Sequence, residues 1–221
     1  AGYNDSWQDG SYGDNYNELS DYDAGFPEDI KIFWTGQAVC QPVEQKTLDN
    51  FRTKKLPEGR TERRSPLFWL NWPVNDVNMN RLMMGKGSLL HTDVDVNDLA
   101  GVVTNPMQDA EASKVAIFAV ADYSWNVADF NADKSWEDSF PYVDADAAES
   151  LHTLAKHMSD PAPNGHGLTL AESEELKPLL DEFMAAYEAG NLEKEKAENL
   201  IKEFEVIIKA CADFHVLSKN E

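Results

Sequence analysis

Three short apolar runs, separated by polar or helix-forming segments, constrain the fold of this chain most. They are DIKIFWTG at 29–36, SPLFWLNWPVND at 65–76 and LAGVVTNPM at 99–107. Uninterrupted apolar runs of this length are typical of strands that are buried on both faces, as in a parallel sheet. The segment 44–56 predicts a helix between the first two runs, and alternation of strands with helices is the signature of βα units.

The pattern changes to helix after residue 107. We predict one helix after Thr169, with Thr169 and Glu172 as a capping box and Gly190 as its end. The other helical segments are 109–125, 144–158 and 192–219. The expected fold is therefore α/β over residues 1–143, followed by an all-α helical bundle over 144–221, and residues 1–26 read as a long polar loop.

Charge and composition exclude several classes of partner. The 221 residues carry 40 acidic and 19 basic side chains, for a formal charge of −21. Nucleic acid is not expected as a partner, because phosphate binding needs clustered Lys and Arg. No run of about 18 apolar residues exists, so no membrane insertion is expected. The two cysteines, Cys40 and Cys211, lack metal or redox spacing and are expected to be buried apolar side chains.

All three predicted strands end in polar or turn residues. These are Thr35-Gly36, the stretch from Asn71 to Asp76, and Thr104-Asn105-Pro106. Ligand sites in parallel βα folds lie at the carboxyl ends of the strands. Asn and Thr also terminate strands for purely local reasons, so the pattern alone leaves a structural role equally open.

The types of residue at these ends narrow the class of ligand. Trp34, Trp69 and Trp72 offer flat apolar faces with a donor at the ring edge. Asn offers a paired donor and acceptor, and an ionised Asp accepts from neighbouring hydroxyls. This combination suits a sugar ring. Nucleotides fit poorly, because no Gly-rich phosphate loop and no Lys/Arg clamp lies beside these positions in the sequence.

Metal and cofactor chemistry find little support in the sequence. The stretch DVDVND at 93–98 resembles the start of a calcium loop, but Asp98 stands where Gly is needed and Thr104 where Glu is needed. The five histidines form no metal-binding pair and are expected at the surface or in loops. No metal, cofactor or nucleophile motif is therefore expected.

Five segments resemble glycoside hydrolase family 84, the bacterial hyaluronidase-like β-N-acetylglucosaminidases and O-GlcNAcases. They occur in the order of the family: YNDSW, IKIFWTG, FWLNWPVND, GVVTNPMQDAEASKVAIFAVADYSWN and HMSDPAPNGHG. The resemblance implies a (β/α)₈ barrel followed by a helical domain. It also implies removal of terminal β-linked N-acetylglucosamine with retention, with the acetamido oxygen of the substrate as the nucleophile.

The same resemblance implies roles for individual residues. Tyr3 and Trp69 match residues that contact or wall the acetamido group, and Thr35 and Val39 match residues that line the site after the sixth strand.

Three further matches would hold the sugar ring. Asn71 and Asn105 match residues that hydrogen-bond the sugar, and Asp76 matches the aspartate that binds its outer hydroxyls.

The chain departs from the family pattern at the catalytic step. The two adjacent catalytic aspartates of the family lie on the fourth strand, and this sequence contains no Asp-Asp dipeptide. The resemblance therefore implies the C-terminal half of the barrel, strands five to eight, with no catalytic residue in this chain. Its expected partners are a glycan or glycoprotein that contains N-acetylglucosamine and the N-terminal half of the barrel.

Two other functions stay open from the sequence. A non-catalytic carbohydrate-binding protein could keep the sugar contacts without the acids, and a helical scaffold would use the strands only structurally. The family and the acidity together lead us to expect a secreted or cell-surface bacterial protein.

Overall fold

The computed structural model describes residues 23–53, 56, 58–159 and 169–218. Tyr3 and the polar segment 1–22 therefore lie outside the described residues. The elements are β1 (Phe33–Trp34), α3 (Gln45–Thr53), β2 (Leu67–Pro73), the 3₁₀ helix η1 (Val96–Asp98), β3 (Gly101–Asn105), α4 (Ala110–Trp125), α5 (Ala132–Val143), α6 (Ala148–Ala155), α7 (Leu176–Glu188) and α8 (Lys194–Leu217).

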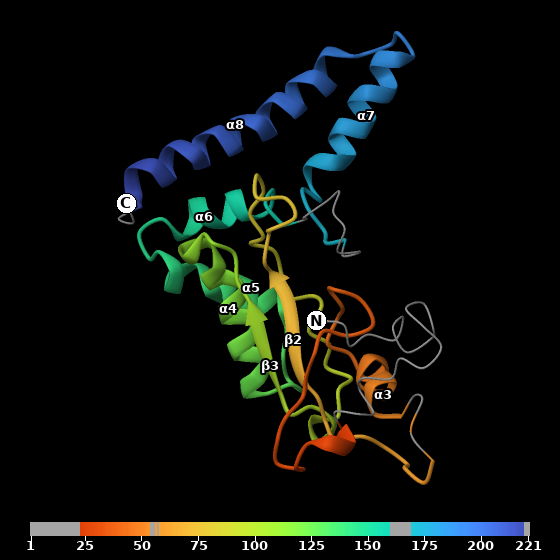
Figure 1. Ribbon diagram of the computed structural model, residues 1–221. Helices are drawn as coiled ribbons and strands as arrows, with labels where there is room; N and C mark the ends of the chain where they lie inside the picture. Colours follow the sequence, from red (N-terminus) through yellow and green to blue (C-terminus); the bar gives the residue numbers. More distant parts are fainter. Residues whose placement is uncertain (1–22, 54–55, 57, 160–168, 219–221) are drawn as a thin grey trace.

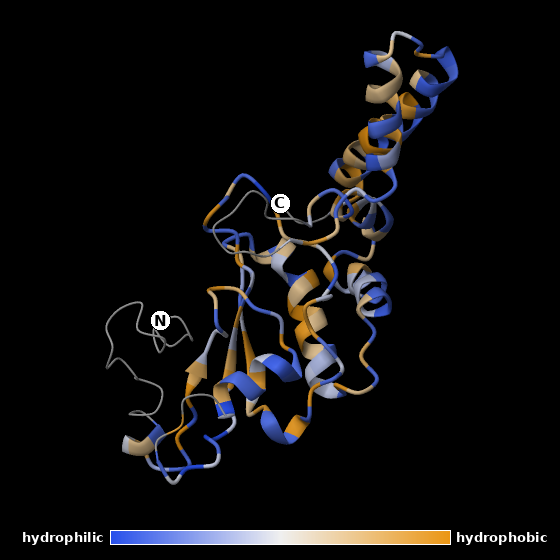
Figure 2. Cartoon of the chain, turned by 90° about the vertical axis from the view of Figure 1, so that its right-hand side faces the viewer, coloured by the Kyte–Doolittle hydropathy of each residue, from blue (hydrophilic) through white to orange (hydrophobic). Residues whose placement is uncertain are grey.

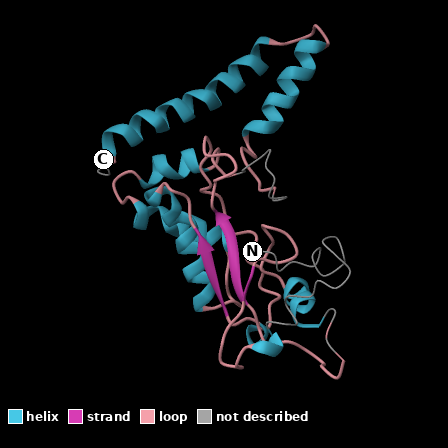
Figure 3. Ribbon diagram, in the orientation of Figure 1, coloured by secondary structure: helices cyan, strands magenta, loops and turns pink. Residues whose placement is uncertain are grey.

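The three strands form one parallel sheet in the order β1-β2-β3, as the sequence predicts. Phe33 pairs with Leu67, and Leu67 pairs with Gly101, so the carboxyl ends of all three strands point the same way. The register slips between Leu70 and Pro73, near the end of β2. The strands are shorter than the apolar runs, and loops continue the chain from the ends of the strands (Figure 3).

Burial along β2 alternates with the pleat of the strand. Phe68, Leu70 and Trp72 are fully buried, whereas Trp69 and Asn71 point to the opposite face. Trp69 is 37% exposed. The prediction that both faces are buried is therefore wrong for β2 among the described residues, because its two faces differ in exposure. Figure 2 shows the strands largely in hydrophobic colours.

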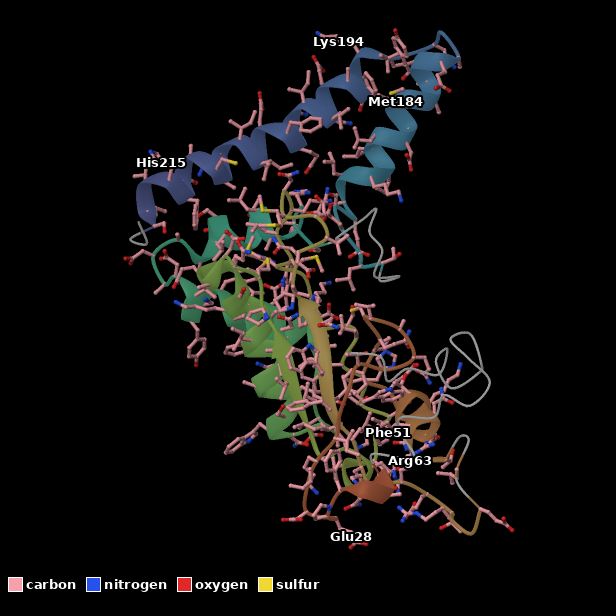
Figure 4. All side chains as sticks on the ribbon, in the orientation of Figure 1. Glu28, Phe51, Arg63, Met184, Lys194 and His215 are labelled. Carbon is pink, nitrogen blue, oxygen red and sulfur yellow. The ribbon has the colours of Figure 1, made fainter. Side chains whose placement is uncertain are left out.

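Aromatic side chains fill the core between the sheet and α3. The ring centroid of Trp34 lies 5.0 Å from that of Phe51 and 6.3 Å from that of Phe68. Arg63 donates from Nη1 to the Phe51 carbonyl over 2.5 Å and so ties the loop before β2 to the end of α3 (Figure 4). Each large apolar side chain buried in this way contributes about 2 kcal/mol to stability.

The sequence analysis did not predict α5. Asn131 caps this helix by accepting the backbone N–H of Lys134 over 2.9 Å. The segment is polar and contains Pro141, so it lacks a strong apolar signal, and yet it buries Trp136 and Phe140 in the main core. Tertiary packing, rather than local propensity, stabilises this helix.

The predicted helix over 144–158 begins later, at Ala148. The Asp144 carboxylate accepts the backbone N–H groups of Asp146 and Ala147, both over 3.1 Å, and this turn separates α5 from α6. The main hydrophobic core runs on through α5 to Leu151 and Ala155 of α6. The division of the chain at 143/144 stays a prediction.

The predicted capping box at Thr169 is wrong, because α7 begins only at Leu176. The Ser173 carbonyl accepts the backbone N–H groups of Leu176 and Lys177 and starts the helix. Glu172 instead binds the Ser159 backbone N–H over 2.8 Å and pairs with Arg81. The predicted end at Gly190 is confirmed by its φ of +71°, a conformation that favours glycine.

Helices α7 and α8 form a hairpin, and α8 runs back across α6 (Figure 1). Leu200 and Ala210 of α8 are buried, but Ile201 and Ile208 are 54% and 67% exposed, so the apolar side chains of this helix are only partly covered. Cys40 is buried as predicted, whereas the same prediction for Cys211 is wrong. Among the described residues, no helix has both the length and the apolar character needed to cross a membrane.

Candidate functional site

The carboxyl ends of β2 and β3 are joined directly by hydrogen bonds. The Val74 backbone N–H donates to the Asn105 carbonyl over 2.9 Å, and the Thr104 hydroxyl donates to the Trp72 carbonyl over 2.5 Å. These contacts carry the pairing of the two strands past the irregular register of β2. They also place the polar residues that follow each strand at one edge of the sheet.

Asn71 connects three of the predicted site residues. Its Oδ1 accepts from Trp69 Nε1 over 2.9 Å and from Asn105 Nδ2 over 3.1 Å. Its Nδ2 donates to the Val39 carbonyl over 2.6 Å. The structure thus brings together Val39, Trp69, Asn71 and Asn105, which come from the ends of all three strands.

Two contacts fix the side chain of Trp69. Its indole N–H is bound to Asn71, and its ring meets the ring of Phe33 edge to face, with centroids 5.6 Å apart and planes at 78°. Phe33 is 45% exposed on the same open face of the sheet. The sequence analysis missed Phe33, although its alternation with the buried Ile32 and Trp34 is the signal that could have found it.

The loop after β1 is shaped by a hydrogen bond and a glycine. The Thr35 hydroxyl donates to the Ala38 carbonyl over 3.2 Å. Gly36 has a φ of +91°, and a Cβ added there would lie 2.5 Å from Cβ of Gln41. Only glycine fits both conditions. The side chain of Val39 is consequently presented at the surface of this loop, 53% exposed.

Cys40 contacts the backbone of Asn71. Its buried thiol donates to the Asn71 backbone carbonyl over 3.0 Å. Burial raises the pKa of this thiol to about 12, so it remains protonated at neutral pH. A protonated thiol is a poor nucleophile, which makes Cys40 a packing and hydrogen-bonding residue.

Asp76 lies on the turn that follows β2. The buried Asn75 anchors this turn, since its Nδ2 donates to the Arg81 carbonyl over 2.7 Å and its own carbonyl accepts the Asn78 N–H over 3.0 Å. The Asp76 side chain is exposed. Val74 links this loop to Asn105, so Asp76 follows the end of β2 that is tied to β3.

The carboxylates of the 93–98 stretch bind groups of the protein itself. Asp93 accepts from the Gln45 N–H over 3.3 Å, Asp95 accepts from the Asn97 N–H over 2.9 Å, and Asp98 pairs with Arg52. Among the described residues, no group of three or more His, Cys, Asp or Glu side chains is placed to hold a metal ion. These acidic residues therefore serve the local fold of η1 and its contact with α3.

The edge of the sheet combines an exposed indole with two side-chain amides, and the exposed Asp76 carboxylate lies on the turn that follows β2. Such an arrangement can stack on an apolar ring face and hydrogen-bond the hydroxyl and amide groups around the rim of that ring.

Comparison with known proteins agrees with the resemblance of the five segments. A family model described as beta-N-acetylglucosaminidase (NAGidase) matches residues 2–156. The chain therefore belongs to this family of β-N-acetylglucosaminidases, glycoside hydrolase family 84.

The chain is similar to proteins of known structure and to further relatives in sequence. It superposes on CpGH84D with a TM-score of 0.82 at 46% identity, over 97% of this chain and 34% of that protein. It superposes on CpGH84B with a TM-score of 0.74 at 24% identity, over 99% of this chain and 37% of that protein, which supports the fold alone. The O-GlcNAcases of Rattus norvegicus and Mus musculus are each 28% identical over 103 residues, which are 46% of this chain and 10% of each relative. The chain thus spans a minor part of the length of its relatives.

Proposed function

We propose that this chain supplies the sugar-binding half of the active site of a glycoside hydrolase that removes terminal β-linked N-acetylglucosamine. The observation that carries the proposal is the hydrogen-bonded cluster of Trp69, Asn71, Asn105 and Val39 at the carboxyl ends of three parallel strands. Membership of the β-N-acetylglucosaminidase family supplies the class of substrate.

In this proposal the sugar is held against the open edge of the sheet. Trp69 walls the acetamido group together with Thr35 and Val39, while Asn105 and Asp76 bind hydroxyls of the ring. A confined acetamido group keeps its carbonyl oxygen close to the anomeric carbon, where it can displace the leaving group and form a cyclic intermediate that water then opens. This is the substrate-assisted, retaining route.

The groups that polarise the acetamide and protonate the leaving oxygen come from outside this chain in our proposal. The sequence has no adjacent pair of aspartates, whereas the resemblance to the family implies such a pair on the fourth strand of the barrel. This chain therefore binds and orients the sugar, and the proton transfers belong to the other half of the site.

We further propose that the sheet is completed by the N-terminal half of a (β/α)₈ barrel. Phe33 and Trp69 leave one face of the sheet partly exposed, and β1 and β3 each have one edge without a paired strand among the described residues. Open edges and half-covered apolar faces favour association with further strands.

The test uses the intact native protein. We expect calorimetry to detect binding of N-acetylglucosamine, and we expect hydrolysis of an aryl β-N-acetylglucosaminide with retention of configuration. Asp76→Asn keeps the size of the side chain and should weaken binding of the sugar by about tenfold, because a charge-assisted hydrogen bond is lost. Binding without any turnover would instead indicate a carbohydrate-binding protein, and absence of both would overturn the proposal.

A further inference from the structure

We infer that Asn71 is a positioning residue whose side-chain amide orients Asn105, so that Asn105 presents its Oδ1 to the ligand as a hydrogen-bond acceptor. The site would then select a ligand that carries a hydroxyl or N–H donor at this place. The inference rests on the proposed function in one respect, namely that the ligand at this edge is a sugar.

The orientation of the Asn71 amide follows from its neighbours. An indole N–H can only donate, so the Asn71 atom that lies 2.9 Å from Trp69 Nε1 must be the acceptor Oδ1. Nδ2 of Asn71 then faces the Val39 carbonyl over 2.6 Å, where a donor is needed. Both ends of the amide agree on one orientation.

Most of the hydrogen-bonding groups of Asn71 are already used by protein neighbours. An amide oxygen has two acceptor positions, and Trp69 and Asn105 fill both. One of the two N–H groups is used by Val39, and the backbone carbonyl of Asn71 accepts the Cys40 thiol. Asn71 retains a single N–H, so its main contribution is to hold its neighbours.

The orientation of Asn105 follows in turn. It donates from Nδ2 to Asn71 Oδ1 over 3.1 Å, and a flipped amide would place two carbonyl oxygens against each other. Its backbone is fixed separately, because the Asn105 carbonyl accepts the Val74 N–H. The Oδ1 of Asn105 is thus turned away from Asn71. A ligand without a donor there leaves this oxygen without a partner, and that loss is what discriminates between ligands.

The first experiment varies the ligand. N-acetylglucosamine derivatives in which one hydroxyl at a time is replaced by fluorine or by hydrogen are bound to the native protein and to Asn105→Ala. Fluorine has the size of a hydroxyl but cannot donate. One hydroxyl should stand out, because its replacement weakens binding to the native protein but does not change binding to Asn105→Ala. At that hydroxyl we expect the fluoro and the deoxy compound to lose affinity for the native protein equally, by about tenfold. A fluoro compound that keeps its affinity at that hydroxyl would show that Asn105 donates and would overturn the inference.

The second experiment removes the hydrogen bonds by which Asn71 orients Asn105. Asn71→Leu removes both hydrogen-bonding ends, so Asn105 can turn and the penalty of the fluoro compound should shrink relative to that of the deoxy compound. Asn71→Asp keeps the acceptor oxygen and should preserve the pattern while weakening all ligands. Asn199→Asp on the exposed face of α8 is the matched control for the added charge.

A spectroscopic readout separates positioning from general stability. With ¹⁵N-labelled tryptophan, the Trp69 indole resonance is assigned by its loss in Trp69→Phe. We expect this resonance to move upfield in Asn71→Leu and to stay in place in Asn199→Asp. An unmoved resonance would contradict the inference. Native protein that binds none of the sugars would instead refute the proposed function, so the two failures are distinct.

Discussion

Val74 and Asn105 are joined by a backbone hydrogen bond of 2.9 Å beyond the point where the register of β2 against β3 becomes irregular. The Thr104 hydroxyl reinforces this junction through the Trp72 carbonyl. The loop that carries Asp76 therefore starts from a fixed position relative to β3, although it is itself exposed.

Removal of the Thr104 hydroxyl should loosen this junction. Thr104→Val keeps the shape of the side chain but leaves the Trp72 carbonyl without this donor, and we expect a loss of about 1 kcal/mol in the free energy of unfolding. Urea unfolding of the native protein measures the change. Thr53→Val removes a comparable hydroxyl from an exposed helix surface, where the loss should be smaller. Equal losses in the two variants would contradict this reading of the junction.

Two glycines with the same backbone conformation separate strain from crowding. Gly36 and Gly59 have φ of +91° and +82°, but a Cβ meets Gln41 only at Gly36 and finds open space at Gly59. We expect Gly59→Ala to cost about 1 kcal/mol and Gly36→Ala about 2–4 kcal/mol of stability.

The same pair tests the role of the loop after β1 in binding. Gly36→Ala should also weaken sugar binding, because the segment that carries Val39 must shift, whereas Gly59→Ala should leave affinity unchanged. Calorimetry on both variants checks this, and a loss of affinity in both would contradict the assignment of this loop to the site.

Two nearby tryptophans should behave oppositely on truncation. Trp34 is almost completely buried, so Trp34→Ala should lower the free energy of unfolding by about 3–5 kcal/mol. Trp69 is partly exposed, so Trp69→Ala should cost far less stability but lower the affinity for the sugar by about 2 kcal/mol. Chemical unfolding and calorimetry report the two quantities separately. Retained sugar affinity in Trp69→Ala would exclude stacking on this ring.

His152 should make stability depend on pH. Its ring lies 4.6 Å from that of Trp136 and 4.9 Å from that of Phe140, between centroids. Burial lowers the pKa of this histidine from its ordinary 6.5, although Glu137, whose carboxylate lies 3.2 Å from Nε2, partly opposes the shift. The unfolded chain then binds the proton more readily. Stability is therefore complete above pH 6.5 and declines as the pH falls below it.

The prediction is tested by unfolding between pH 5 and 8. His152→Gln should flatten the decline on the acidic side, whereas His215→Gln on the exposed surface of α8 should leave it unchanged. An unchanged acidic decline in His152→Gln would assign the pH dependence to other groups.

The sequence predicts the parallel sheet and the convergence of its strand ends because both follow from local patterns. Apolar runs are visible along the chain, and Thr35, Asn71 and Asn105 each lie toward the C-terminal end of one of them. The division of labour within the site is not visible, because it depends on which amide atom of Asn71 meets which neighbour. That choice is made only when Trp69, Asn105 and the Val39 carbonyl come together.

The features that the sequence analysis missed or predicted wrongly have a common physical origin in tertiary packing. α5 forms from a weakly patterned segment because Trp136 and Phe140 complete the core. Glu172 fits a capping box by sequence, but pairing with Arg81 and binding of the Ser159 N–H take its carboxylate elsewhere. Cys211 is an apolar residue of α8, yet it is exposed, because the packing of α8 on the described residues does not cover it.

The pleat of β2 places neighbouring residues on opposite faces of the sheet, so polar-capable and purely apolar side chains alternate. Trp69 and Asn71 lie on the open face of the sheet, while Leu70, between them, faces the core. Insertion of one residue before Trp69 would exchange the faces, placing an indole and an amide in the hydrophobic interior and a leucine on the open face of the sheet. The spacing of two residues between Trp69 and Asn71 is therefore as much a requirement for the proposed sugar site as the identity of either side chain.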